Sequence, residues 1–220
     1  VGDVGGQVWR FDFVQGQPIA NLATGGVIAK LGLGGETSAA NNRRFYHSPD
    51  VALTDLGGSK KLVVTIGSGS RPSPLSEVVN DRFYALFQDA VFGAPVSYVP
   101  LLEGDDPSTG ATETSDLYDA TANLLQVGSS NEILIEQSKL SLAQGWYIDL
   151  TRSGEKVLSR RLTFRGTVSF TTYEPTNISG SCIAKAGTSR VYLMALAERA
   201  ATEALLHDTA TNVPQLPYSL

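Results

Sequence analysis

Apolar and polar positions between residues 48 and 87 predict three consecutive β-strands. Leu62–Ile66 is a short, β-rich, continuous apolar run, which is typical of a strand covered on both faces. Phe83–Phe87 places its two phenylalanines and an alanine at alternate positions, which predicts one apolar face. The Gly57-Gly58 pair permits the positive φ angles of a tight hairpin. We therefore expect an antiparallel sheet with strands at Asp50–Leu53, Lys61–Gly67 and Arg82–Phe87.

The third of these strands has two partial echoes elsewhere in the chain. Gln7–Phe11, Arg82–Leu86 and Arg190–Met194 share a polar, apolar, aromatic opening. Two of them follow an earlier apolar strand, Leu62–Gly67 in one case and Thr167–Tyr173 in the other. Chance similarity among aromatic-rich strands is one explanation. The other, which we favour, is a β-propeller, whose blades bury their faces against one another. This predicts an all-β fold with strands from about three blades and at least one open sheet edge, rather than a closed barrel or sandwich.

Further strands are expected on the same grounds. They are the possible strand Val27–Leu31, the run Trp146–Leu150, a hairpin of Val157–Arg165 with Thr167–Tyr173 about Gly166, and Val191–Leu196. Beyond this last strand, Ala195–Leu206 has good helix propensity, so the structure of residues 195–212 stays open. The core is expected to contain Leu62, Val64, Ile66, Phe83, Phe170 and the ring of Trp9.

Residues of about 93–144 interrupt the strand pattern and predict an insertion. The tract Glu103–Ser108 has the composition of an exposed loop. Ser115 could cap a short helix over Asp116–Leu125, whereas Asn131–Gln144 is ambiguous between helix and strand. Long loops on a rigid β-scaffold often carry recognition, so the insertion is the candidate partner-facing element; its alternative is a solvent loop without a role. The partner-facing candidates are Glu103, Asp105 and Asp106.

Composition excludes several classes of protein. With 42% apolar and 18% charged residues, the chain of 220 residues is globular rather than disordered. A net charge of −5 argues against a nucleic-acid surface. No apolar run reaches membrane-spanning length. Cys182 is the sole cysteine, which excludes an internal disulfide and a thiolate zinc site. The chain does not begin with Met, so we expect a fragment or a processed piece.

No catalytic constellation is recognisable in the sequence. His47 and His207 are the only histidines, and neither lies in a motif with a carboxylate and a nucleophile. The Gly67–Ser70 run lacks the Lys-Ser/Thr that a phosphate-binding loop needs. The acidic residues near position 105 match no EF-hand spacing, so a solvated acidic loop is the better interpretation. We therefore expect a protein that is not an enzyme.

An ordered series of motifs resembles the PilY family, the tip-associated factors of type IV pili. Gly2–Asp12 resembles the blade signature of that family, and so does Ile66–Arg71 followed by Asp81–Leu86. Further landmarks follow in the family's order at Ser115–Thr121, Gly145–Leu150, Gly154–Leu158, Phe170–Pro175, Cys182 and Ser189–Tyr192. The Ala-rich tract Ala195–Ala204 departs from the polar turn often seen in the family.

The resemblance implies that residues 1–220 are part of one C-terminal domain, a modified quinoprotein-like β-propeller. It implies a non-enzymatic, extracellular role at the pilus tip or outer-membrane surface of a bacterium, in pilus assembly, retraction control, surface sensing and adhesion. The implied partners are minor pilins, other segments of the same propeller, and a host or abiotic surface. The family's calcium loop would lie upstream of Gly2-Asp3, so the implied calcium site is not contained in this chain. The resemblance also leaves open whether Cys182 forms a disulfide with a cysteine outside this chain.

Two other functions remain as alternatives. A quinone-cofactor-dependent dehydrogenase of propeller architecture would need a calcium-bound cofactor and a catalytic Asp. A carbohydrate-binding propeller would need Trp9, Trp146 and Tyr147 as exposed stacking platforms, although core packing is the better interpretation of these rings. Dye reduction would reveal the first and glycan binding the second.

Overall fold

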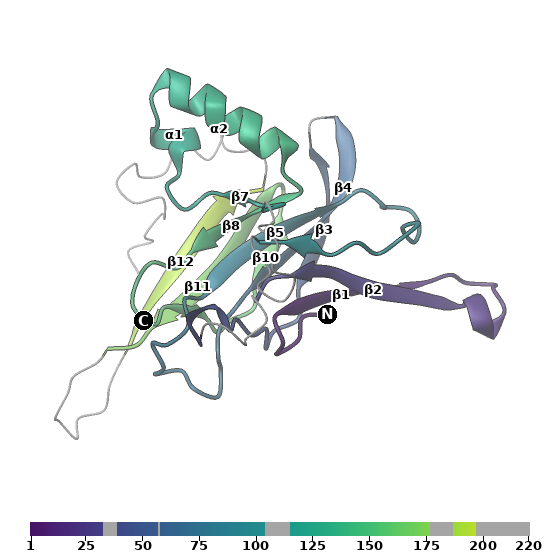
Figure 1. Ribbon diagram of the computed structural model, residues 1–220, viewed down its shortest axis with the longest axis horizontal. Coiled ribbons are helices and arrows are strands. Elements are labelled where there is room, and N and C mark those ends of the chain that lie inside the picture. The colour runs from purple at the N-terminus through teal and green to yellow at the C-terminus, as the bar shows by residue number, and fades with distance from the viewer. Residues whose placement is uncertain (33–38, 57, 104–114, 177–186, 197–220) are drawn as a thin grey trace.

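Three β-sheets stacked face to face form the body of the molecule (Figure 1). The computed structural model describes residues 1–32, 39–56, 58–103, 115–176 and 187–196. The central sheet has the strand order β3-β4-β5-β8-β7. Its strands are β3 (Asp50–Leu56), β4 (Ser59–Gly67), β5 (Arg82–Gln88), β8 (Gly145–Asp149) and β7 (Tyr118–Asp119). Neighbours are antiparallel except for β7 and β8, which pair in parallel.

An outer sheet covers each face of the central one. The first sheet has the order β1-β2-β6 and consists of β1 (Gln7–Phe13), β2 (Ala23–Lys30) and β6 (Leu101–Leu102). The third sheet contains β10 (Leu162–Phe164), β11 (Thr167–Glu174) and β12 (Thr188–Ala195), with β9 (Lys156–Val157) also pairing with β11. Two short 3-10 helices, η1 (Ile19–Asn21) and η2 (Ala39–Asn41), lie in connections.

Alternation along the central strands sends apolar side chains into both interfaces. On β4, Val63 packs toward the third sheet and Val64 toward the first. On β5, Phe83 and Ala85 face the third sheet, whereas Tyr84 and Leu86 face the first. In a strand that is buried on both faces, successive side chains are all shielded from water, which explains the continuous apolar run at Leu62–Ile66.

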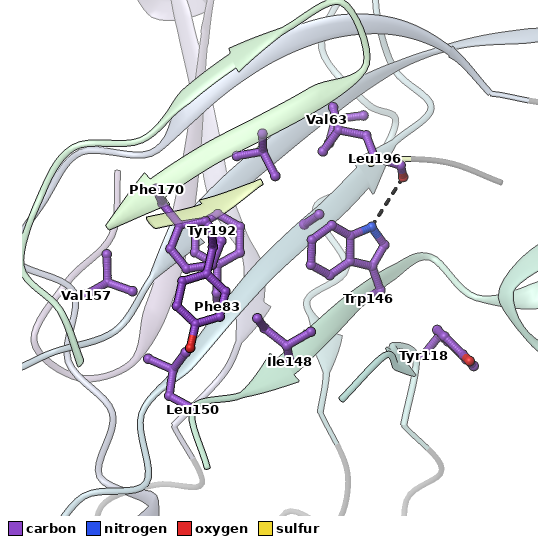
Figure 2. Close-up of a cluster of buried hydrophobic side chains, with 12 residues drawn as sticks. Val63, Phe83, Tyr118, Trp146, Ile148, Leu150, Val157, Phe170, Tyr192 and Leu196 are labelled. Atoms are coloured by element: carbon purple, nitrogen blue, oxygen red, sulfur yellow. Dashed lines mark hydrogen bonds between the residues drawn. The ribbon is translucent and has the colours of Figure 1, made fainter. Parts of the chain in front are cut away.

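Stacked aromatic rings fill the interface between the central and third sheets (Figure 2). The rings of Phe83 and Phe170 are parallel, with centroids 3.8 Å apart, and Phe170 stacks in turn on Tyr192 at 4.8 Å. Trp146 closes one end of the cluster, where its Nε1 donates a hydrogen bond to the carbonyl of Leu196 at 3.2 Å. Aromatic stacking adds to the free energy of area burial, so this cluster joins the two sheets strongly.

The all-β prediction is confirmed, and each of the three echo strands lies in a different sheet. Gln7–Phe11 lies in β1, Arg82–Leu86 in β5 and Arg190–Met194 in β12. For the last two, the preceding apolar strand is the antiparallel hairpin neighbour, β4 and β11 respectively. The sheets stack in the way that propeller blades stack, and the described residues form no closed barrel. The finer assignment to a modified quinoprotein-like propeller stays a prediction.

Most of the expected strands and core residues are present. The hairpin about Gly166 is confirmed, with Arg165 and Gly166 both at positive φ, although its first strand is only β10. Val64, Ile66, Phe83 and Phe170 are buried, as expected. Leu62 and Trp9 are only half-buried: Leu62 lies toward the end of β4 that projects beyond the interfaces, and Trp9 lies beside the exposed Phe11. Residues 197–212 and Cys182 lie outside the described residues.

The expected helix over Asp116–Leu125 is wrong. Ser115 forms a local turn with the backbone of Leu117 instead of a helix cap, and Tyr118 then pairs with Trp146 in the central sheet. Helix α1 (Leu124–Val127) starts only after these residues, and the ambiguous segment forms helix α2 (Ser130–Leu142). Pairing with a strand distant in sequence has overridden local propensity.

Candidate functional site

The helical part of the insertion lies at one end of the molecule, beyond β7 and β8 (Figure 1). Helix α2 begins with a capping box: the Ser129 hydroxyl accepts from the Glu132 amide, and the Glu132 carboxylate accepts from the Ser129 amide at 2.8 Å. Leu140 and Ala143 pack against the aromatic cluster and anchor the helix. The insertion is therefore a fixed element of the fold in its described residues.

Helix α2 exposes three large aliphatic side chains. Leu134 is 65% exposed, Ile135 54% and Leu142 83%. Single exposed apolar residues are normal on a surface, whereas several on one helix make a candidate contact surface. These three residues were not predicted from the sequence. The Ser129-x-x-Glu132 capping box could have predicted them from the sequence. It marks where a helix begins, and the helical repeat then gives the side on which each apolar residue lies.

A cleft of about 320 Å³ lies between the C-terminal end of α2 and β7. Its lining includes Asp116, Tyr118, Lys139 and Leu142. The polar groups there are already engaged: Asp116 accepts from the Leu102 amide at 2.8 Å, and Lys139 donates to Glu136 at 2.7 Å. Burial, and then the hydrogen bond to Glu136, raise the pKa of the Tyr118 hydroxyl. The cleft therefore has a mixed polar and apolar lining, in which Asp116 and Lys139 are held by partners within the chain.

Glu103 does not lie on an exposed loop, so this part of the partner-facing prediction is wrong. Its side chain is buried at 6% exposure, and it accepts a hydrogen bond from Arg43 and one of 2.5 Å from the Tyr84 hydroxyl. Arg82 lies 3.3 Å from the same carboxylate. Asp105 and Asp106, the other two candidates, lie outside the described residues.

Burial raises the pKa of Glu103, while the guanidinium groups of Arg43 and Arg82 oppose that shift. Burial and the Glu103 charge raise the pKa of Tyr84. On its solvent side, Arg82 hydrogen-bonds Asp149, and its guanidinium lies 4.2 Å from the centre of the Tyr147 ring. The side chains of this buried polar network come from several segments of the chain. They hold one another in place at the interface between the central and first sheets.

A second buried carboxylate, Asp81, was not anticipated from the sequence. Its Oδ1 accepts from the Ser68 hydroxyl at 2.6 Å, whereas its Oδ2 has no hydrogen-bond partner within the described part of the chain. Burial raises its pKa to about 6, against the opposing effects of Ser68, Lys156 and Arg43. The ammonium of Lys156 is held by three backbone carbonyls and does not depend on Asp81 for hydrogen bonds.

Asp81→Asn is expected to change how stability depends on pH. A carboxyl group with a pKa of 3.8 unfolded and about 6 folded makes the native state bind more protons between these values. The free energy of unfolding of the parent should therefore fall as pH rises through this window, by about 3 kcal/mol at most. The variant should show a flatter profile and exceed the parent in stability at pH 7.5. Urea unfolding at pH 4.5, 6 and 7.5 measures this dependence of stability on pH.

Asp89→Asn, at an exposed carboxylate, is the matched control. Parallel profiles of stability against pH for the parent and Asp81→Asn would contradict the raised pKa of Asp81.

The aromatic rings proposed as a carbohydrate platform do not form one. Trp146 is buried at 3% exposure, inside the aromatic cluster. Trp9 and Tyr147 are half-buried and lie in different sheets, and Trp9 donates to the Asp3 carboxylate at 2.9 Å. These rings pack and position rather than stack on a sugar.

Asp3 does not fit a role as a calcium ligand. One carboxylate oxygen accepts from the amides of Gly5 and Gln7, each at 2.9 Å, and the other accepts from Trp9. Its lone pairs fix the tight turn that leads into β1, with Gly6 at a φ of 77°. Among the described residues, no group of three or more His, Cys, Asp or Glu side chains could hold a metal ion.

No protein-family model matches the chain, and no curated protein matches it. Among solved structures, the crystal structure of the Pseudomonas aeruginosa PilY1 C-terminal domain aligns with 88% of the chain, at 13% sequence identity and a TM-score of 0.49. The chain spans 43% of the length of that domain. In the described residues, no helix is long and apolar enough to cross a bilayer.

Proposed function

We propose that this chain is part of a non-enzymatic β-propeller that acts at the tip of a type IV pilus. Its roles there are pilus assembly, control of retraction, and attachment to a surface or host cell. The proposal places it outside the cell, in contact with minor pilins and with other segments of the same propeller. Calcium would bind in the longer protein, upstream of Gly2.

The proposal is supported by the ordered motifs and by what they build. Gly2–Asp12 forms the Asp3-centred turn and strand β1, and Asp81–Leu86 forms the buried carboxylate and strand β5. Ser189–Tyr192 lies in β12. Each of these three motifs thus contributes a strand to one of the three stacked sheets.

The exposed aliphatic side of α2 is the observation that carries a binding function. The three side chains defined above project from a helix that is anchored to the aromatic cluster at Leu140. On the helix itself, Lys139 donates to Glu136 at 2.7 Å, so this charged pair is satisfied within the chain. An apolar helix face on a rigid support suits docking of another protein, because little conformational entropy is lost on binding.

The double variant Ile135→Lys, Leu142→Lys tests this surface in the parent gene. Both side chains are exposed, so the protein should fold with unchanged thermal stability. Two charges placed in an apolar contact should weaken it by about 2 kcal/mol or more, roughly thirty-fold. Piliation, twitching motility or attachment should therefore decrease.

Leu75→Lys is the control, because Leu75 is exposed in the loop between β4 and β5. A folded double variant with all three phenotypes normal would show that α2 is not the partner surface. If deletion of the entire propeller also left piliation and attachment unchanged, the pilus function itself would fail. Failure of α2 alone therefore differs from failure of the proposed function.

A further inference from the structure

Arg161, directly before β10, carries the least satisfied buried charge in the described structure. The residue is only 7% exposed, and both terminal nitrogens, Nη1 and Nη2, lack a hydrogen-bond partner among the described residues. Buried polar groups in folded proteins are almost always hydrogen-bonded. An unpaired buried guanidinium costs several kcal/mol, so its presence points to a counter-ion that completes it.

A second orphaned nitrogen lies on the segment packed against Arg161. His47 hydrogen-bonds the backbone of Leu158, yet its Nε2 is buried without a partner in the described part of the chain. Three residues on, Asp50 Oδ2 accepts from the Thr163 amide at 2.6 Å. Residues 47–50 and 158–163 are thus held side by side, and each of these two segments carries an orphaned buried group.

The charges around this junction are predominantly positive. Arg71, Arg160 and Arg161 all act electrostatically on His47, and together with burial they lower its pKa. Within the described residues, the carboxylate that acts on Arg161 is that of Asp50, whose Oδ2 already accepts from the Thr163 amide. Burial lowers the pKa of Arg161 to about 10, as expected for a cation without a sufficient counter-charge.

We propose that Arg161 and His47 form a binding site for a small oxyanion, a phosphate or carboxylate group, at the junction of β3 with the loop that leads into β10. The two Nη groups of a guanidinium donate in parallel to two oxygens of such an anion. His47 can add a third hydrogen bond from Nε2 once its ring is protonated, since its other ring nitrogen is committed to Leu158. This site is independent of the α2 surface and of the pilus proposal.

Binding and protonation should therefore be coupled. An anion beside His47 offsets the three arginines and favours the imidazolium, so the anion should raise the pKa of His47. By reciprocity, the anion should bind more tightly as pH falls through that pKa. The chain has only two histidines, so the ring signals can be assigned with a His47→Gln variant.

NMR titration of the histidine rings in the 220-residue chain tests the proposal. The pKa of His47 is measured in chloride, in inorganic phosphate and in acetate at one ionic strength. A rise of roughly one pKa unit, equal to a tenfold preference of the anion for the protonated form, is expected in at least one oxyanion. Phosphate and acetate distinguish the two classes of ligand.

Arg161→Gln should fold, because it removes an unpaired buried charge, and it should abolish the oxyanion-dependent shift. Lys60→Gln removes an equal charge at an exposed position on β4 and should retain the shift. Absence of any oxyanion-dependent shift in the parent overturns the proposal. So does an equal shift in Arg161→Gln, since the effect would then be general screening.

Discussion

Phe170→Ala is expected to lower the free energy of unfolding by about 3–5 kcal/mol, because the neighbouring side chains cannot fill the cavity that the buried ring leaves. Phe170 lies between Phe83 and Tyr192 and contacts both rings face to face. Its loss therefore removes two stacking contacts and opens a cavity between the central and third sheets. Chemical denaturation with circular dichroism measures the change.

Phe164→Ala is the matched control, since the same ring is 65% exposed on the neighbouring strand β10. This variant should change stability by less than about 1 kcal/mol. A double-mutant cycle with Phe83→Ala should give a coupling energy of about 0.5–1.5 kcal/mol for the parallel pair. Equal losses for Phe170→Ala and Phe164→Ala would mean that the aromatic cluster does not hold the sheets together.

Glu103→Ala is expected to destabilise the chain by about 3–5 kcal/mol, because it leaves the buried Arg43 guanidinium without its counter-charge. It also removes the nearer of two acceptors of the Tyr84 hydroxyl, the other being the Leu31 carbonyl, and one partner of Arg82. Thermal unfolding at pH 7 should show a clear decrease in Tm relative to the parent.

Asp89→Ala provides the comparison for Glu103. The Asp89 side chain is 80% exposed, and its ion pair with Lys61 should contribute less than about 1 kcal/mol. Adding Arg43→Met to Glu103→Ala should recover part of the lost stability, because the unpaired charge is then removed. A single variant with parental stability would contradict the burial of this network.

The central strands were predictable because their signal is local. A run such as Leu62–Ile66 is read within five residues, and the hairpin from β4 to β5 follows from sequence neighbours. The echo strands predicted that similar units recur, and their stacking follows from the apolar faces of β5. What the pattern could not provide was the order of the short parallel strands.

The errors share a cause in long-range pairing. Glu103 looks like a loop residue because its neighbours in sequence are acidic and glycine-rich, whereas its partners Arg43 and Tyr84 lie 60 and 19 residues away. Local spacing predicted that Tyr118 lies in a helix, but it pairs instead with Trp146 in β8, 28 residues further along the chain. The orphaned Arg161 was invisible because burial, not residue type, makes it unusual.

Two short strands of the insertion, β6 and β7, have a consequence for the order of assembly. Strand β6 joins the first sheet through β2, and β7 joins the central sheet through β8, in both cases in parallel. Each is two residues long and pairs only with a strand that has already found its own neighbours. Closing such long loops is slow compared with zipping the β3-β4-β5 hairpins. We therefore expect the insertion to dock after the adjacent sheets have formed. The amide protons of β6 and β7 should be the last to gain protection from hydrogen exchange during refolding.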